Sequence, residues 1–454
     1  MRTALVLIAA AALAACTTTP AVEQPTRVQA IEAALPPAKS FGATRPQPAA
    51  RSNANIAADF LDLHFALESG AELPVFTRFE TPITVRLTGT VPPTMQSDLT
   101  RLLSRLRREA RLDITQISDG PASITIEGVS QEQIQRTLPQ AACFVVPNSA
   151  SLEEYRRDRR KQKSNWTALR SREKIGIFIP YDASPQEIRD CLHEELAQSL
   201  GPLNDLYHLP DSVFNDDNFH TILTGFDMLI LRTAYAPELR SGMTRDQVAA
   251  VLPGILRRLN PRGENIPAQP VSETPREWIK AVQTSLGSTS ASARRVRAAE
   301  QAVRIGEEQG WTDHRRAYPH YLLGRMAQFD DAERAQWHYA VALKYLKATA
   351  GTEIHQAHVT AQTASYALAR GRGPSVIPEL DDAIAVMQQA ENAALLATLL
   401  LLKSEALRQS GRPDQARTVR LDSIGWARYG FGSDLVARSV SDGIAEQAAR
   451  NTNG

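Results

Sequence analysis

The sequence predicts an α+β domain over residues 54–260, followed by an all-α helical-repeat domain over residues 275–450. Two observations predict this division. Before residue 260, short segments with the period-two alternation of strands occur together with segments at helical spacing. After residue 275 the chain has helical spacing almost throughout, and turn signals recur about every 40 residues. The length of 454 residues suits two or three domains.

The bulk charge excludes one class of partner. Lys and Arg number 51 against 50 Asp and Glu, which leaves a formal net charge of +1. No global electrostatic field therefore favours nucleic acid. No glycine-rich P-loop motif occurs either, so we predict no nucleic-acid partner and no nucleotide hydrolysis.

The N-terminus predicts a lipoprotein signal peptide over residues 1–16. Arg2 precedes an apolar run from Ala4 to Ala15, which is too short to cross a bilayer. The ending Leu-Ala-Ala-Cys at Cys16 resembles the bacterial lipobox, in which the cysteine is acylated; cleavage by ordinary signal peptidase is the alternative. Since Thr17 follows, the resemblance implies the periplasm of a Gram-negative cell envelope, with lipid in the outer membrane.

Two segments read as connectors. Residues 17–53 are rich in Pro, Ala and Thr without a period, which predicts a flexible tether. Residues 261–274 predict a linker between the two domains.

The elements of the first domain follow in order along the chain. Alternation predicts strands near 81–89, 122–129, 142–147 and 174–181, and helical spacing predicts a helix near 95–112. A second helix is predicted over 186–200, because Ser184 is a suitable N-cap and Gly201 with Pro202 ends the pattern.

The pattern of residues 275–450 predicts about four helix pairs. Its turn signals lie at Gly287, near Gln328, at Gly371 and at Gly411. The pattern resembles degenerate tetratricopeptide-type (TPR-like) repeats, and a non-repetitive helical bundle is the alternative. Stacked repeats leave a concave surface that usually binds protein or peptide, so we expect such a partner here.

Two cysteines remain once Cys16 carries lipid. Cys143 and Cys191 form an even pair, and in an oxidising compartment such a pair predicts one disulfide. Two buried free thiols are the alternative.

The helix over 186–200 contains a His-Glu pair, which raises the question of a zinc peptidase. Such peptidases place two histidines at i and i+4, but four residues after His193 stands Ala197. His193 and Gln198 point about 140° apart around the helix, so they cannot share one ion.

A shift by one residue restores the metzincin spacing, H-E-x-x-H-x-x-G-x-x-H. The shifted positions are Glu194 and Gln198 as metal ligands, Glu195 as general base, Gly201 as turn glycine and Asn204, beside Asp205, as third ligand. Only the general base and the glycine keep their identity.

The residues at these positions disfavour zinc catalysis. They supply oxygen donors, which suit Ca²⁺ or Mg²⁺ better than zinc. Neither of those ions lowers the pKa of bound water as far as zinc does. No cofactor is therefore predicted, and a bound divalent metal (zinc or calcium) is the alternative. Three readings stay open: a non-catalytic relative of a peptidase, a hydrolase with unusual ligands, and a structural helix with a solvated polar face.

Residues 54 to about 260 resemble the bacterial domain of unknown function 2927. The resemblance is carried by "CLHEELAQSLGPLNDLYHLPDSVFNDDNFH" and "TGFDMLILRTAYAPELRSGM". It implies a zincin-like fold, that of zinc peptidases, but no established activity. Met243 then lies where a methionine turn would support the metal site, although a core methionine is the alternative.

Two further clusters are candidate sites. An acidic loop contains Asp211, Asn215, Asp216 and Asp217, and His208 and His220 would supply imidazoles if this loop folded over the helix. Residues 155–174 contain nine Lys and Arg, which predicts either contact with an anionic envelope polymer or a solvated face.

Together these patterns predict an outer-membrane-anchored envelope interaction or scaffold protein. Its peptidase-like domain is expected to bind a peptide or cell-envelope ligand without cleaving it. The alternative is a metal-dependent peptidase that uses Glu195 as general base.

Overall fold

The computed structural model describes residues 36–44, 46–215, 217, 219–287 and 290–432. Cys16, residues 17–35 of the predicted tether and residues 433–450 of the predicted repeats lie outside this range. Among the described residues, no helix combines the length and apolar character needed to cross a bilayer.

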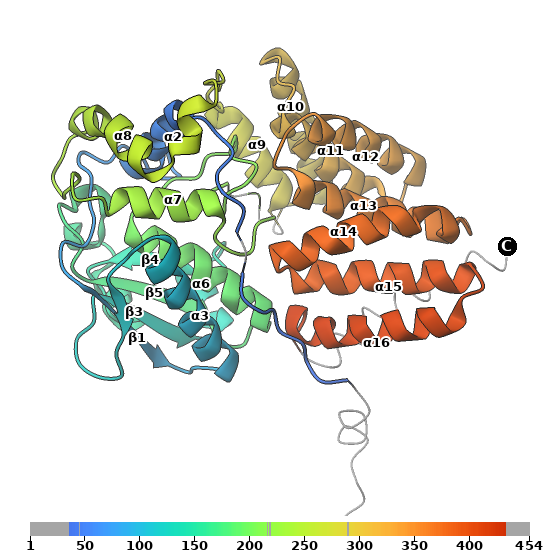
Figure 1. The fold of residues 1–454 in the computed structure, drawn as a ribbon, viewed down its shortest axis with the longest axis horizontal. Coiled ribbons are helices and arrows are strands. Elements are labelled where there is room, and N and C mark those ends of the chain that lie inside the picture. The colour runs from blue at the N-terminus through green and yellow to red at the C-terminus, as the bar shows by residue number, and fades with distance from the viewer. Residues whose placement is uncertain (1–35, 45, 216, 218, 288–289, 433–454) are drawn as a thin grey trace, which may run out of the picture. The chain divides into compact units, whose positions relative to one another are not determined.

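The first region is built on a five-stranded mixed sheet of order β2-β1-β3-β5-β4 (Figure 1). The strands are β1 (Ile83–Gly89), β2 (Ile114–Gln116), β3 (Ile124–Val129), β4 (Phe144–Pro147) and β5 (Ile175–Pro180). β1 pairs in parallel with β2 and β3, β3 pairs in parallel with β5, and β4 is antiparallel to β5. The four predicted strands are confirmed, whereas the three-residue β2 was not predicted because it is too short to show alternation.

Side chains of β5 alternate between two cores, as the period-two geometry of a strand requires. Ile175, Ile177 and Ile179 enter the main core together with Leu196 of helix α6. Phe178 faces the other way into a smaller core with Phe144. Both faces of the sheet are therefore covered.

Seven helices of this region surround the sheet. They are α2 (Asn53–Phe65), α3 (Pro93–Glu109), α4 (Gln131–Thr137), α5 (Leu152–Asp158), α6 (Pro185–Leu200), α7 (Gly225–Ala234) and α8 (Arg245–Leu259). Both predicted helices are confirmed, as α3 and α6. α6 begins after Ser184, whose side chain accepts a hydrogen bond from the amide of Glu187 at 3.2 Å, and it ends at Gly201.

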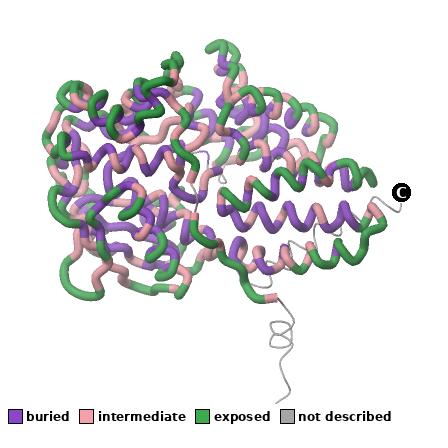
Figure 2. The backbone as a smooth tube through the Cα atoms, viewed as in Figure 1, coloured by how far each residue is buried: buried purple, intermediate pink, exposed green. Residues whose placement is uncertain are grey.

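Over its described residues, the second region contains eight long helices in four pairs. They are α9 (Arg276–Leu286), α10 (Ser292–Glu308), α11 (His314–Ala327), α12 (Ala332–Lys347), α13 (Glu353–Ala369), α14 (Ile377–Ala390), α15 (Ala393–Gln409) and α16 (Pro413–Gly430). Each predicted turn falls between the two members of a pair. Figure 2 shows α15 as the most continuously buried of the lower helices, and its leucines at 396 and 399 are fully buried.

The two regions are joined by direct contacts. At one contact, Arg189 of α6 pairs with Glu391 between α14 and α15 at 3.2 Å. At another, Phe219 enters the core of the helical region beside Tyr318 and His355. Residues 266–274 run between them, and Gln269 exchanges two backbone hydrogen bonds with the Asn55 side chain, at 2.7 and 2.9 Å.

Residues 36–52 fall within the predicted tether and lie against both regions. Phe41 stacks on Trp426 of α16 with ring centroids 4.5 Å apart. Arg51 pairs with Asp59 of α2 at 3.1 Å. This part of the segment is therefore docked onto the folded regions.

Candidate functional site

Helix α6 carries the predicted site and is fixed by its apolar face and by a disulfide. Leu192 and Leu196 bury its apolar face in the main core. A disulfide joins Cys191 to Cys143, just before β4, with the two Cα atoms 6.0 Å apart. The disulfide predicted from the cysteine count is confirmed, and it attaches the middle of α6 to the edge strand.

Glu195, the predicted general base, is buried. The residue is only 5% exposed, and one carboxyl oxygen, Oε2, has no hydrogen-bond partner within the described chain. Burial raises the pKa of Glu195 well above its usual range, and the charges of Glu194 and Glu68 raise it further. Burial therefore favours the neutral form of this carboxyl group over the charged form.

His193 is also buried, and its imidazole Nδ1 accepts a hydrogen bond from the amide of Leu223 at 3.0 Å. Burial lowers its pKa well below the usual range. The reading of His193, Glu194 and Glu195 as a solvated face is wrong for His193 and Glu195, and Glu194 is half-buried.

The C-terminal end of α6 is held by a buried arginine that the sequence did not single out. The Arg172 guanidinium donates to the carbonyls of Gln198 at 2.6 Å, Ser199 at 2.7 Å and Gly201 at 2.5 Å. Burial lowers the pKa of Arg172 to about 10. The last carbonyls of a helix lack partners within the helix, so this cation both satisfies them and opposes the negative end of the helix dipole.

His64 of α2 lies directly against Gly201. A Cβ atom at position 201 would approach its Nε2 to 2.7 Å, so only glycine allows this contact. The His64 Nδ1 atom is 2.8 Å from the carbonyl oxygen of Phe60, whereas Nε2 has no partner in the described chain. Burial lowers the pKa of His64 to about 3, so the imidazole is neutral.

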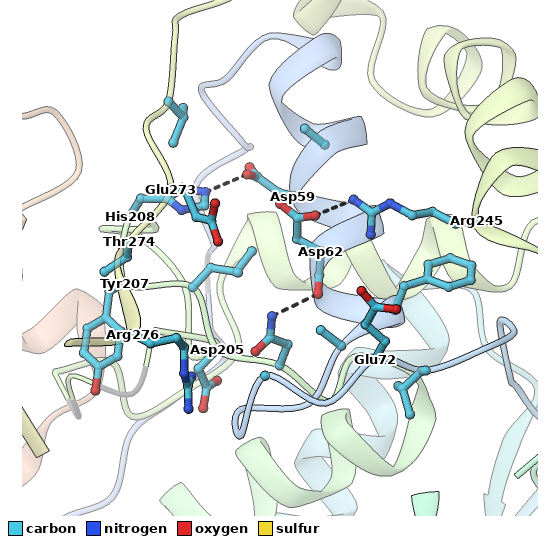
Figure 3. Close-up of a pocket in the computed structure, with 18 of the residues that line it drawn as sticks. Asp59, Asp62, Glu72, Asp205, Tyr207, His208, Arg245, Glu273, Thr274 and Arg276 are labelled. Atoms are coloured by element: carbon cyan, nitrogen blue, oxygen red, sulfur yellow. Dashed lines mark hydrogen bonds and ion pairs between the residues drawn. The ribbon is translucent and has the colours of Figure 1, made fainter. Parts of the chain in front are cut away.

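Asn204 and Asp205 line an open cleft of about 820 Å³ (Figure 3). Asn204 donates through its side-chain amide to the carbonyl oxygen of Asp62 at 3.0 Å. Its amide is thus used to bind α2. Glu195 and Gln198 are not among the residues that line this cleft, and Gln198 is 7% exposed.

Five segments build the cleft: α2, the loop after it, the loop after α6, the start of α8 and residues 271–279. Its charged side chains were not predicted, because they come from segments distant in sequence. The carboxylates in its lining are Asp59, Asp62, Glu72, Asp205, Asp246 and Glu273, and the arginines are Arg245 and Arg276. The lining therefore has more negative than positive charge.

Several of these charges are paired across the cleft. His208 Nε2 lies 2.8 Å from a carboxylate oxygen of Asp59, and Arg245 pairs with Asp62 at 2.5 Å (Figure 3). His208 thus lines the cleft but contacts α2 rather than α6. His220 lies elsewhere, with Nε2 2.9 Å from the carbonyl oxygen of Pro210.

The described side chains of the acidic loop bind residues outside α6. Asp211 pairs with Arg51, Asn215 donates to the carbonyl of Leu209, and Asp217 accepts from His355 at 2.8 Å. Asp216 lies outside the described residues. Over the described ranges, no three His, Cys, Asp or Glu side chains are grouped so as to hold a metal ion. The predicted ligand positions Gln198 and Asn204 fall outside that residue set.

The basic stretch 155–174 is partly neutralised. Asp158 pairs with Lys161 at 2.5 Å and with Lys163 at 2.7 Å, and Glu154 pairs with Lys174 at 2.9 Å. Arg172 is buried, as described above. Met243 is half-buried, and its carbonyl accepts from the amide of Phe76 at 2.9 Å.

Comparison with known families concerns the first region. Residues 53–254 match the family described as Protein of unknown function (DUF2927). This match confirms the family resemblance predicted for residues 54 to about 260. No curated protein and no solved structure matches the chain. Residues 53–254, the DUF2927 region, span the sheet, α6 and α2, so all the α6 contacts above except those to the helical region lie within it.

Proposed function

We propose that this protein is a lipid-anchored periplasmic interaction or scaffold protein whose zincin-like DUF2927 region binds a peptide or cell-envelope ligand in the cleft beside α6 without cleaving it. The observation that carries the proposal is that the predicted site residues do not all lie in one place. Asn204 and Asp205 line the 820 Å³ cleft, whereas Glu195 and Gln198 lie in the buried helix outside its lining. A ligand in the cleft would meet no general base from α6.

The ligand class follows from the lining. Ligand sites are concave, with a few convergent polar groups among apolar ones. Here Phe65, Leu73 and Ile279 supply apolar surface among the charged side chains. Because carboxylates outnumber arginines, a peptide with lysine side chains fits the cleft better than an acidic one.

Anchoring at Cys16 and location in the periplasm belong to the same proposal. The Cys143–Cys191 disulfide supports it, since disulfides persist in oxidising compartments. Metabolic labelling with a fatty-acid analogue tests the anchor: the parent incorporates the label and Cys16→Ser does not. Equal labelling of both proteins contradicts the proposal.

Binding is tested by fluorescence anisotropy on the chain that lacks residues 1–16. The probes are labelled Lys-Ala-Ala-Lys and Glu-Ala-Ala-Glu. We expect tighter binding of the lysine peptide, lost in Glu72→Lys/Glu273→Lys and kept in the control Glu333→Lys, which lies on α12 outside the cleft lining. Equal binding of both peptides, or no effect of the double variant, contradicts the proposal.

The second candidate function is a metal-dependent hydrolase with Glu195 as general base. It is favoured by the raised pKa of this buried carboxyl group, since such groups cluster at catalytic sites. Elemental analysis of the parent and of Glu194→Ala/Gln198→Ala separates the two. About one equivalent of zinc in the parent and none in the variant supports the hydrolase, as does peptide hydrolysis that Glu195→Gln abolishes.

A further inference from the structure

A second hollow, of about 320 Å³, lies in the helical region between α12 and α13. On α12 its wall is formed by Ala332, Ala335 and Tyr339, which are spaced along one helix face. On α13 the facing wall is formed by Gln362, Tyr366 and Ala369, which also lie along one helix face. The hollow is open because alanines occupy positions where larger side chains would close the gap between the two helices.

The back wall is formed by the closely packed side chain of Tyr339. The ring of Tyr339 lies so close to Gly324 of α11 that a Cβ atom there would approach the ring to 2.5 Å. Its hydroxyl group donates to the side-chain oxygen of Gln328 at 3.2 Å. Tyr339 is only 1% exposed, so its ring is held between α11 and α12 behind the hollow.

Two features of the lining point to a ligand. Phe329, at the rim in the turn between α11 and α12, is 85% exposed, far more than any other large apolar residue of the described chain. Gln336, Gln362 and Ser365 make no side-chain hydrogen bonds within the described chain. An amide side chain can both donate and accept, so these groups match hydroxyl and acetamido groups, which do the same.

Charge narrows the ligand class. Among the described residues that line the hollow, Arg370 is the one charged side chain and none is a carboxylate. Arg370 and Arg372 both lie over the ring of Tyr366, at 5.1 and 6.0 Å from its centroid. An anionic ligand is therefore favoured. An amphipathic helix fits poorly, because polar side chains lie among the apolar ones and leave no continuous apolar groove.

We infer that this hollow, defined by Phe329, Gln336, Gln362, Tyr366 and Arg370, is a binding site for an oligosaccharide that carries a carboxylate group. The C–H face of a sugar ring packs on the negative face of the Phe329 ring. Its hydroxyl groups bind the glutamine amides, and its carboxylate pairs with Arg370. The site is separate from the cleft beside α6 and does not depend on the function proposed for that cleft.

The test is isothermal titration of the chain lacking residues 1–16. The acidic probes are tetragalacturonate and an N-acetylglucosamine/N-acetylmuramic acid tetramer. The matched neutral probe is fully methyl-esterified tetragalacturonate, and tetraglutamate represents an acidic peptide. We expect at least one acidic saccharide to bind, and the methyl ester to bind about tenfold more weakly than tetragalacturonate if the latter is the one bound.

Variants then locate the site. Phe329→Ala should weaken binding about tenfold or more, and Arg370→Ala should abolish the preference for the acidic saccharide. The matched control is Trp337→Ala, which removes a second exposed aromatic ring; Trp337 lies on α12, is 58% exposed and does not line the hollow. Circular dichroism confirms that each variant is folded. The inference is overturned if neither acidic saccharide binds, if only tetraglutamate binds, or if Phe329→Ala and Trp337→Ala bind equally.

Discussion

The two ends of helix α6 are used differently. At the N-terminal end, Gln186 and Arg189 point to the helical region, where they bind Asn392 and Glu391. At the C-terminal end, the last carbonyls are bound by the buried Arg172, and the chain then continues into the cleft. Both ends are therefore tied to other elements, one to another region and one to the core.

The way α6 is held bears on whether it can act as the catalytic helix of a peptidase. A catalytic helix needs side chains that face an open site, whereas α6 buries both Glu195 and Gln198. Its polar groups serve instead to position neighbouring segments. We interpret α6 as a structural support on which the cleft and the contact with the helical region are both built. The following variants test each end in turn.

The largest effect is expected at the C-terminal end from Arg172→Met. Three buried carbonyls would lose their donor, and each unsatisfied group costs about 1–3 kcal/mol. We expect the free energy of unfolding to fall by about 5 kcal/mol in total, measured by urea denaturation.

The matched control is Arg170→Met, because Arg170 is exposed and lies in the same loop. Its free energy of unfolding should change by less than about 0.5 kcal/mol. Arg172→Lys, which keeps a cation but not the forked geometry, should fall between the two. Equal stabilities of the two methionine variants would remove Arg172 as the support of this end.

A smaller effect is expected at the N-terminal end from Arg189→Ala. Arg189 and Glu391 are both buried, and removal of one partner of such a pair typically costs about 3 kcal/mol or more. Because this pair joins the two regions, the variant should unfold in two steps rather than one when followed by the tryptophans of each region.

The double variant Arg189→Met/Glu391→Met is the control. It removes both charges, so most of the lost stability should return. A double variant as unstable as Arg189→Ala would show that the pair itself, rather than an unpaired buried charge, decides the effect.

The sequence predicted the local structure better than the site. Strands, α6 with its Ser184 cap, and the helix pairs follow from patterns within a few residues, and the disulfide follows from the cysteine count. The cleft does not, because Asp62, Asn204 and Glu273 come together only through tertiary contacts. Arg172 was hidden in a basic stretch and His64 was a lone histidine, so neither gave a signal before its neighbours were known.

The next effect concerns pH and compares His64, beside the C-terminal end of α6, with His314, in the second contact between the regions. Burial lowers the pKa of each to about 3, from about 6.5 in an unfolded chain. The unfolded state therefore binds more protons between these values. Stability is complete above pH 6.5 and falls by up to about 1.4 kcal/mol per pH unit per histidine as the pH drops toward 3.

Urea denaturation at pH 7, 6 and 5 measures this slope. His64→Leu and His314→Leu should each lose some stability at pH 7, because each imidazole bonds a backbone carbonyl. Each should also show a shallower loss on acidification than the parent. A slope unchanged in both variants contradicts neutral burial of these histidines.

The smallest effect, and the one of opposite sign, is expected from Glu195→Gln. The pKa of Glu195 is raised in the folded state, so its ionisation in the unfolded chain favours unfolding as the pH rises above about 4.5. Glutamine cannot ionise, so this pH-dependent loss of stability disappears. The variant must, however, bury a polar amide group in place of the carboxylic acid. We expect a net gain of about 1 kcal/mol in the free energy of unfolding at pH 7 and none at pH 4.5.

The control is Glu194→Gln, on the half-buried neighbour, which should change the free energy of unfolding by less than about 0.5 kcal/mol. A stability gain in Glu195→Gln without loss of ligand binding in the cleft identifies Glu195 as part of the supporting helix. A loss of hydrolytic activity in the same variant would instead restore it to the role of a general base.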